Sequence, residues 1–118
     1  MKMVTKEIEK LFDKYPLYSQ DGKGDDAVVI CKFFNPVGDQ SWYVLEASEE
    51  VDGDRELFVM FTATGRYYEY GYHMLSEFLK CEVTYYSWQM KLERDLYFKG
   101  TVADAKKDAN VTDAFAWD

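Results

Sequence analysis

Residues 93–95, Glu-Arg-Asp, come nearest in this chain to the paired carboxylates that perform acid–base chemistry. Such chemistry would need a second group held at a defined distance from them, which the spacing does not establish. An arginine between two acids is also typical of a bidentate pair with a carboxylate. We therefore interpret Glu93, Arg94 and Asp95 as a structural ion pair that fixes a late strand to the sheet, and keep an enzyme acting through Glu93 and Asp95 as an alternative.

Other patterns of catalytic or metal-binding chemistry are missing. His73 is the single histidine, which excludes a His-based triad and a site with several His ligands. No glycine-rich phosphate loop and no Gly-x-Ser-x-Gly motif occurs. We expect no catalytic residue, no metal and no cofactor, and place His73 as a capping or packing residue before a helix.

A dense acidic segment is the first candidate for partner binding. It places six carboxylates in eleven residues, offset only by Arg55: Glu46, Glu49, Glu50, Asp52, Asp54 and Glu56. On a hairpin tip they would project a negative field that could occupy a basic groove built for phosphates. The alternative is a solvated turn whose charges block edge-to-edge aggregation.

Tyrosines form the second candidate. Tyr67, Tyr68, Tyr70 and Tyr72 would alternate between the two faces of a strand, with Tyr67 opposite the other three. One face would be core and the other a binding surface, because Tyr supplies a large rigid contact area. A weaker aromatic group follows at Tyr85, Tyr86 and Trp88.

The charge balance restricts the partners. Twenty-two acids against fourteen bases give a formal net charge of −8. Nucleic-acid phosphates and anionic membranes repel such a chain, whereas a basic nucleic-acid-binding protein attracts it. No apolar run approaches the roughly 20 residues that span a bilayer, and the N-terminus does not resemble a signal peptide. We expect a cytoplasmic protein that binds neither nucleic acid nor membrane directly; acidity for solubility alone is the alternative.

Two cysteines, Cys31 and Cys81, lie fifty residues apart. We expect both to be reduced and inert in a reducing cytosol, with a disulfide as the alternative. Neither belongs to a Cys-x-x-Cys pair, which argues against zinc.

The elements that would position these residues fit a single domain over residues 1–118. Apolar residues at positions 4, 8, 11, 12 and 15 predict an N-terminal helix over residues 3–15, which Pro16 ends. A core of sheet and helix follows over residues 17–98. A C-terminal helix and tail occupy residues 101–118, with Thr101 as the N-cap.

Strand-like segments dominate the core. They cover residues 27–34, 41–47, 56–64, 67–70 and 92–98, with an amphipathic helical stripe at 74–79 and extended structure at 82–88. In the second strand, alternation places Glu46 and Ala47 on opposite faces, with Ala47 beside Tyr43 and Leu45. Asp52-Gly53 predicts a hairpin turn. The class is α+β: an antiparallel β-meander sheet with an N-terminal helix and one or two short helices packed on one side.

Several short motifs resemble a family of short domains of unknown function encoded on plasmids, phages and conjugative elements. They occur in the family's order between Leu17 and Phe98: Lys32-Phe-Phe-Asn-Pro36, Trp42-Tyr43 with Glu46, Glu69-Tyr-Gly-Tyr72, Leu75-Ser-Glu77 and Glu93-Arg-Asp-Leu-Tyr-Phe98. The resemblance supplies no catalytic residues. It implies an accessory gene of a mobile element, a setting in which small acidic proteins act as anti-CRISPR or anti-restriction proteins.

The hypothesis is therefore a non-enzymatic inhibitor of a host defence system. It would present an acidic, Tyr-rich surface, made by Glu49, Glu50, Asp52, Asp54, Glu56, Tyr67, Tyr68 and Tyr70, to a basic host nuclease or other nucleic-acid-binding protein. The alternative is a homodimeric regulatory or structural domain of the mobile element, paired through a sheet edge or the tyrosine face.

Overall fold

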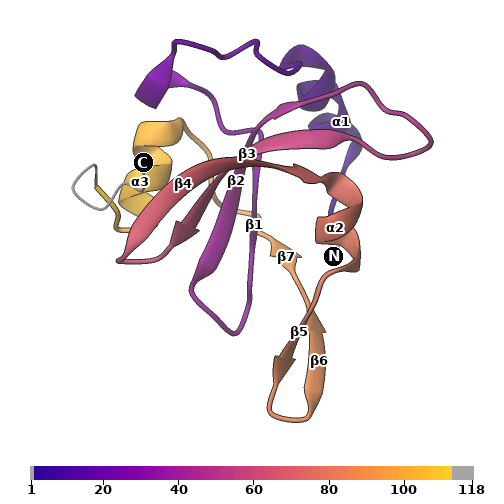
Figure 1. Ribbon diagram of the computed structural model, residues 1–118, viewed down its shortest axis with the longest axis vertical. Coiled ribbons are helices and arrows are strands. Elements are labelled where there is room, and N and C mark those ends of the chain that lie inside the picture. The colour runs from indigo at the N-terminus through magenta and orange to yellow at the C-terminus, as the bar shows by residue number, and fades with distance from the viewer. Residues whose placement is uncertain (1, 113–118) are drawn as a thin grey trace.

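The computed structural model describes residues 2–112, and its centre is a five-stranded antiparallel sheet (Figure 1). The strand order is β4-β3-β2-β1-β7. The strands are β1 (Cys31–Phe34), β2 (Gln40–Ala47), β3 (Glu56–Ala63), β4 (Tyr67–Met74) and β7 (Glu93–Arg94). Strands β1 to β4 are consecutive neighbours, so the predicted meander and the α+β class are confirmed. The tail from residue 113 lies outside the described residues.

Helices cover both faces of this sheet. Helix α1 (Lys6–Lys14), capped by Thr5, and helix α2 (Leu75–Lys80) contribute Phe12 and Phe78 to the first core cluster. These two helices lie on one side, but the prediction that all helices pack on one side is wrong for the third helix, which covers the other core cluster. Helix α3 (Val102–Asp108) packs Val102 and Ala105 into a second core cluster on the opposite face (Figure 1). A 3-10 turn at Gly24–Asp26 contacts α3.

A bulge at Leu45 explains an error in the predicted faces of β2. Val44 pairs with Val59, but Glu46 already pairs with Phe58, so Leu45 is the extra residue. The bulge moves Ala47 into the first core cluster instead of beside Tyr43. Sequence alternation cannot show such an insertion, because it assumes an unbroken period of two.

The strand ends also differ from the prediction. β1 begins four residues later than expected, because upstream only Val28 makes an isolated bridge, with Thr101. β4 runs four residues further, to Met74, since its pairing with β3 is unbroken. β7 has two residues because the Asp95 carboxylate accepts hydrogen bonds from the N–H groups of Tyr97 and Phe98, which turns the chain.

The extended segment after α2 is a separate hairpin. Within residues 2–112, strands β5 (Glu82–Tyr85) and β6 (Trp88–Lys91) pair only with each other, and they project from the body below β7 (Figure 1). Tyr86, at the turn, has a positive φ of 57°. We call residues 82–91 the aromatic ribbon.

The remaining expectations concern the cysteines and the membrane. Both cysteines are free thiols, Cys31 buried and Cys81 half-buried. Burial raises the pKa of Cys31 to about 12, so this thiol is protonated at neutral pH. Between residues 2 and 112, no helix is long and apolar enough to cross a bilayer.

Candidate functional site

The acidic segment forms a well-defined hairpin at one end of β2 and β3, which we call the acidic hairpin (residues 48–56). Val51 and Asp54 exchange two backbone hydrogen bonds of 2.9 and 3.0 Å around the turn Asp52-Gly53. Both turn residues have positive φ, 52° and 79°, which matches the tight turn predicted from this dipeptide.

The hairpin's single cation points inward. Arg55 is 6% exposed, and its Nη atoms lie 3.2 Å from the carboxylates of Glu9 and Asp13 on α1. Nη1 also donates to the Ser48 carbonyl at 3.0 Å, and the guanidinium lies 5.3 Å from the centre of the Phe12 ring. Arg55 thus attaches the hairpin to α1 and does not offset the acids on its outer side.

The six acids of this segment lie in three environments: four are exposed, Asp54 is half-buried and Glu46 is buried. Glu49, Glu50, Asp52 and Glu56 are exposed. Asp54 is half-buried; hydrogen bonds from the Ser76 side chain and backbone N–H, and then from the Arg55 N–H, hold its pKa below the usual value. The Asp54 carboxylate therefore caps the start of α2.

Glu46 departs most from its expected place on the surface. It is 2% exposed and accepts hydrogen bonds of 2.8 Å from the backbone N–H groups of Tyr18 and Gln20. Gln20 in turn donates to the carbonyls of Val28 and Leu45. These buried bonds fasten the loop after α1 to the sheet, so Glu46 is a structural residue.

Tyr67 and Tyr68 do not form one surface with the acidic hairpin. Glu56 pairs with Met74 at one end of β3, and Ala63 pairs with Tyr67 at the other, roughly 24 Å away. Tyr68 is 8% exposed and belongs to the second core cluster, so it is not a surface residue. Tyr72, by contrast, pairs with Phe58, two residues from Glu56, so the exposed part of β4 adjoins the hairpin.

Tyr70 and Tyr72 remain exposed on the edge strand β4. The Phe58 ring stacks on Tyr70 at 5.7 Å and lies 5.0 Å from Tyr72. Burial raises the pKa of Tyr72, and the nearby Tyr18 and Glu46 raise it further. His73, on the other face of this strand, lies 3.2 Å from the Glu77 carboxylate and packs on Phe78, in agreement with a packing role.

The Glu93-Arg94-Asp95 motif is used differently from the predicted ion pair. Arg94 donates from Nε and Nη2 to the Lys2 carbonyl, at 3.2 and 3.0 Å. Asp95 pairs with Lys32 at 3.3 Å. Burial by itself would raise the pKa of Asp95, but the N–H groups of Tyr97 and Phe98, together with Lys32, lower it. Asp95 therefore fixes the turn of the chain after β7 and attaches this turn to β1 through Lys32.

Lys32 extends this network to α3. Its ammonium lies 2.7 Å from the Asp108 carboxylate, which also accepts a 2.7 Å hydrogen bond from the Tyr43 hydroxyl. Burial, followed by the bond to Asp108, raises the pKa of Tyr43. The network joins β1, β2 and α3, and its role is to hold α3 on the sheet.

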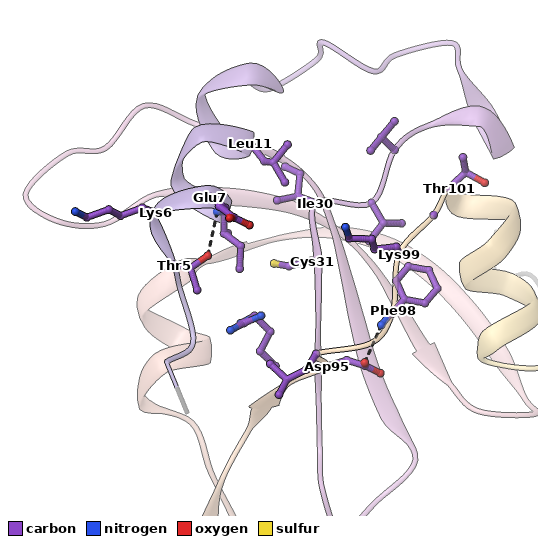
Figure 2. Close-up of a pocket in the computed structure, with 16 residues that line it drawn as sticks. Thr5, Lys6, Glu7, Leu11, Ile30, Cys31, Asp95, Phe98, Lys99 and Thr101 are labelled. Atoms are coloured by element: carbon purple, nitrogen blue, oxygen red, sulfur yellow. Dashed lines mark hydrogen bonds between the residues drawn. The ribbon is translucent and has the colours of Figure 1, made fainter.

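A groove of about 820 Å³ opens between α1, the start of β1 and the segment after β7 (Figure 2). Its lining is mostly apolar and includes Ile8, Leu11, Ile30, Leu96 and Phe98. Thr5, the cap of α1, and Thr101, the cap of α3, lie at its margins. Sequence reasoning missed this groove, because three distant segments form it; the one available signal was the predicted helix cap at Thr101.

Among residues 2–112, no group of three or more His, Cys, Asp or Glu side chains could hold a metal ion. Comparison with known proteins gives one finding. A family model described as a protein of unknown function (DUF2958) matches residues 3–106. No curated protein and no solved structure matches the chain.

Proposed function

We propose that this chain, which belongs to the DUF2958 family of proteins of unknown function, is a binding protein that presents its acidic hairpin to a basic surface of another protein. One observation carries the proposal: the hairpin turns Arg55 inward and leaves Glu49, Glu50, Asp52 and Glu56 outside. Such an arrangement concentrates negative charge where a partner can reach it, and it speeds encounter with a positive surface.

The anchoring of the hairpin supports the same function. The two bonds across Val51 and Asp54, the contacts of Arg55 with α1 and the cap made by Asp54 hold the hairpin in one shape. A carboxylate array that is already ordered loses less conformational entropy on binding than a flexible acidic loop. The hairpin would fit a groove of the partner whose cations are arranged to bind phosphates.

We place the partner among host defence proteins that bind nucleic acid, so that the chain would be an inhibitor of the anti-CRISPR or anti-restriction type. The support for this finer step is the resemblance of the sequence motifs to proteins of mobile elements, together with the net charge of −8. The chemistry requires only that the partner's surface be basic.

Substitution of the exposed acids tests the proposal. Glu49→Gln, Glu50→Gln, Asp52→Asn and Glu56→Gln together raise the formal net charge from −8 to −4 without touching Asp54. We expect the wild type to capture basic nucleic-acid-binding proteins from a host lysate, in competition with added duplex DNA. The fourfold variant should lose them, since charge-driven association depends on these groups.

A matched variant separates position from total charge. Glu7→Gln, Asp21→Asn, Asp26→Asn and Glu82→Gln change four exposed acids elsewhere and give the same net charge of −4. This control should retain the captured proteins. Equal capture by both variants, or capture that duplex DNA does not reduce, would show that the acidic hairpin is not the surface that binds these proteins.

The exposed pair Tyr70 and Tyr72 favours a second candidate, a homodimeric regulatory domain paired through β4. Sedimentation at several concentrations distinguishes it: a stable dimer that Tyr70→Ser and Tyr72→Ser together dissociate supports the dimer, and a monomer throughout supports the first proposal.

A further inference from the structure

The groove beside α1 is less acidic than the molecule around it. Its lining includes three cations, Lys6, Arg94 and Lys99, against two acids, Glu7 and Asp95. Asp95 is already paired with Lys32 and holds two backbone N–H groups. A chain of net charge −8 thus carries an apolar groove with positive groups at its margin.

The cations are placed to receive an anionic group. Arg94 is oriented by the Lys2 carbonyl and makes no ion pair with a carboxylate in the described part of the chain. The Lys99 side chain extends from the segment after β7 toward Ile30 in Figure 2, whereas Lys6 is directed away from the groove. Arg94 and Lys99 are therefore the two cations that a ligand inside the groove would meet.

The floor is suited to an apolar body. Ile8 and Ile30 come from the first core cluster, and Leu11 packs against it. Leu96, 57% exposed, and Phe98 form the opposite wall. A volume of about 820 Å³ lies within the range of protein sites that enclose small organic ligands, which are typically apolar with a few polar groups that fix orientation.

We propose that this groove binds a small amphipathic carboxylate, with its apolar chain on the floor made by Ile8, Leu11 and Ile30 and its carboxylate at Arg94 and Lys99. A guanidinium and an ammonium form charge-assisted hydrogen bonds with a carboxylate. This site is independent of the acidic hairpin and of any partner that binds there.

A titration with octanoate, followed by amide NMR shifts of the full chain, tests the site. We expect saturable shifts centred on Ile30, Cys31 and Lys99. Acetate, which lacks the apolar chain, and 1-octanol, which lacks the charge, should each bind at least about tenfold more weakly. The proposal is overturned if shifts do not saturate at millimolar octanoate, if they centre elsewhere, or if either comparator binds as tightly.

Variants of the protein test which side chains contact the carboxylate of the ligand and which contact its apolar chain. Lys99→Gln should weaken octanoate binding about tenfold and leave 1-octanol unchanged, because it removes one charged contact. Leu96→Ser, at an exposed wall position, should weaken both. Lys107→Gln, an exposed cation on the last turn of α3, is the matched control and should change neither. Equal octanoate affinity in Lys99→Gln and Lys107→Gln would contradict the assignment.

Discussion

Glu46 and Arg55 are charged residues that the fold buries at 2% and 6% exposure. Burying a charge is costly unless hydrogen bonds and opposite charges replace its water. The N–H groups of Tyr18 and Gln20 do this for Glu46. Glu9, Asp13 and the Ser48 carbonyl do it for the two Nη groups of Arg55, whereas the buried Nε of Arg55 has no hydrogen-bond partner among residues 2–112. Neighbouring charges in one acidic run therefore divide into structural groups and groups that face solvent.

Removal of the Glu46 carboxylate should destabilise the fold. Glu46→Ala leaves the N–H groups of Tyr18 and Gln20 without their acceptor in a buried place. We expect it to lower the free energy of unfolding by about 3 kcal/mol, since each orphaned buried donor costs on the order of 1–3 kcal/mol. Urea denaturation measures the change.

Glu56→Ala is the matched control, because Glu56 belongs to the same acidic run but is exposed. Its effect should stay within about 0.5 kcal/mol. Similar losses for Glu46→Ala and Glu56→Ala would mean that the buried contacts of Glu46 do not stabilise the fold.

At the scale of elements, the five-stranded sheet and the aromatic ribbon differ in what supports them. β2 and β3 are covered on both faces by the two core clusters. In the described part of the chain, β5 and β6 pair only with each other, and Trp88 and Tyr86 are 70% and 83% exposed. An isolated two-stranded hairpin is only marginally stable in water, so the ribbon depends on its own short ladder and on Val83, which packs against the first core cluster.

Hydrogen exchange should separate these two elements. Amide protons of β5 and β6 are expected to exchange at least about a hundredfold faster than those of β2 and β3, because opening the ribbon exposes little buried surface. Amide-resolved exchange at neutral pH provides the measurement. Protection of the ribbon equal to that of β2 would show that it unfolds only with the whole molecule.

Helix ends illustrate which local features the sequence encodes. Thr101 was predicted to cap the last helix, and it does so in a capping box with Asp104. Asp52-Gly53 likewise forms the predicted turn. Both depend on residues within a few positions of each other. The length of β7 depended on the Asp95 side chain turning back on its own backbone, which strand propensity does not report.

At the scale of the whole molecule, the described residues form two core clusters, one on each face of the five-stranded sheet. Cys31 lies in the first cluster, on β1, with β2 and β7 on either side. It is 8% exposed, and burial raises the pKa of its thiol to about 12. Cys81, at the end of α2, is half-buried. Cys81 packs against the same cluster, so the two thiols differ in exposure rather than in the part of the fold that they report on.

Alkylation should show this difference. In the native protein, iodoacetamide should label Cys81 first, while Cys31 should react only as urea approaches the unfolding midpoint, because the thiolate is the reactive form. A Cys81→Ser variant isolates the signal of Cys31, and mass spectrometry counts the labels. Labelling of Cys31 in native buffer at the rate of a free thiol would contradict its protected state.

The sequence by itself determined the α+β class, the meander order, the first helix and the cap of the last one. These follow from hydrophobic periodicity, turn residues and caps, which act over a few positions. It also located the acidic hairpin, because its turn chemistry is local.

Only the tertiary structure decided which charges face solvent. It turned Arg55 and Glu46 inward, buried Tyr68, separated Tyr67 from the acids by the length of β3, and assembled the groove from α1, β1 and the segment after β7. These outcomes depend on contacts between residues far apart in the chain. Side-chain direction at such contacts is set by packing and by the Leu45 bulge, and neither leaves a periodic mark in the sequence.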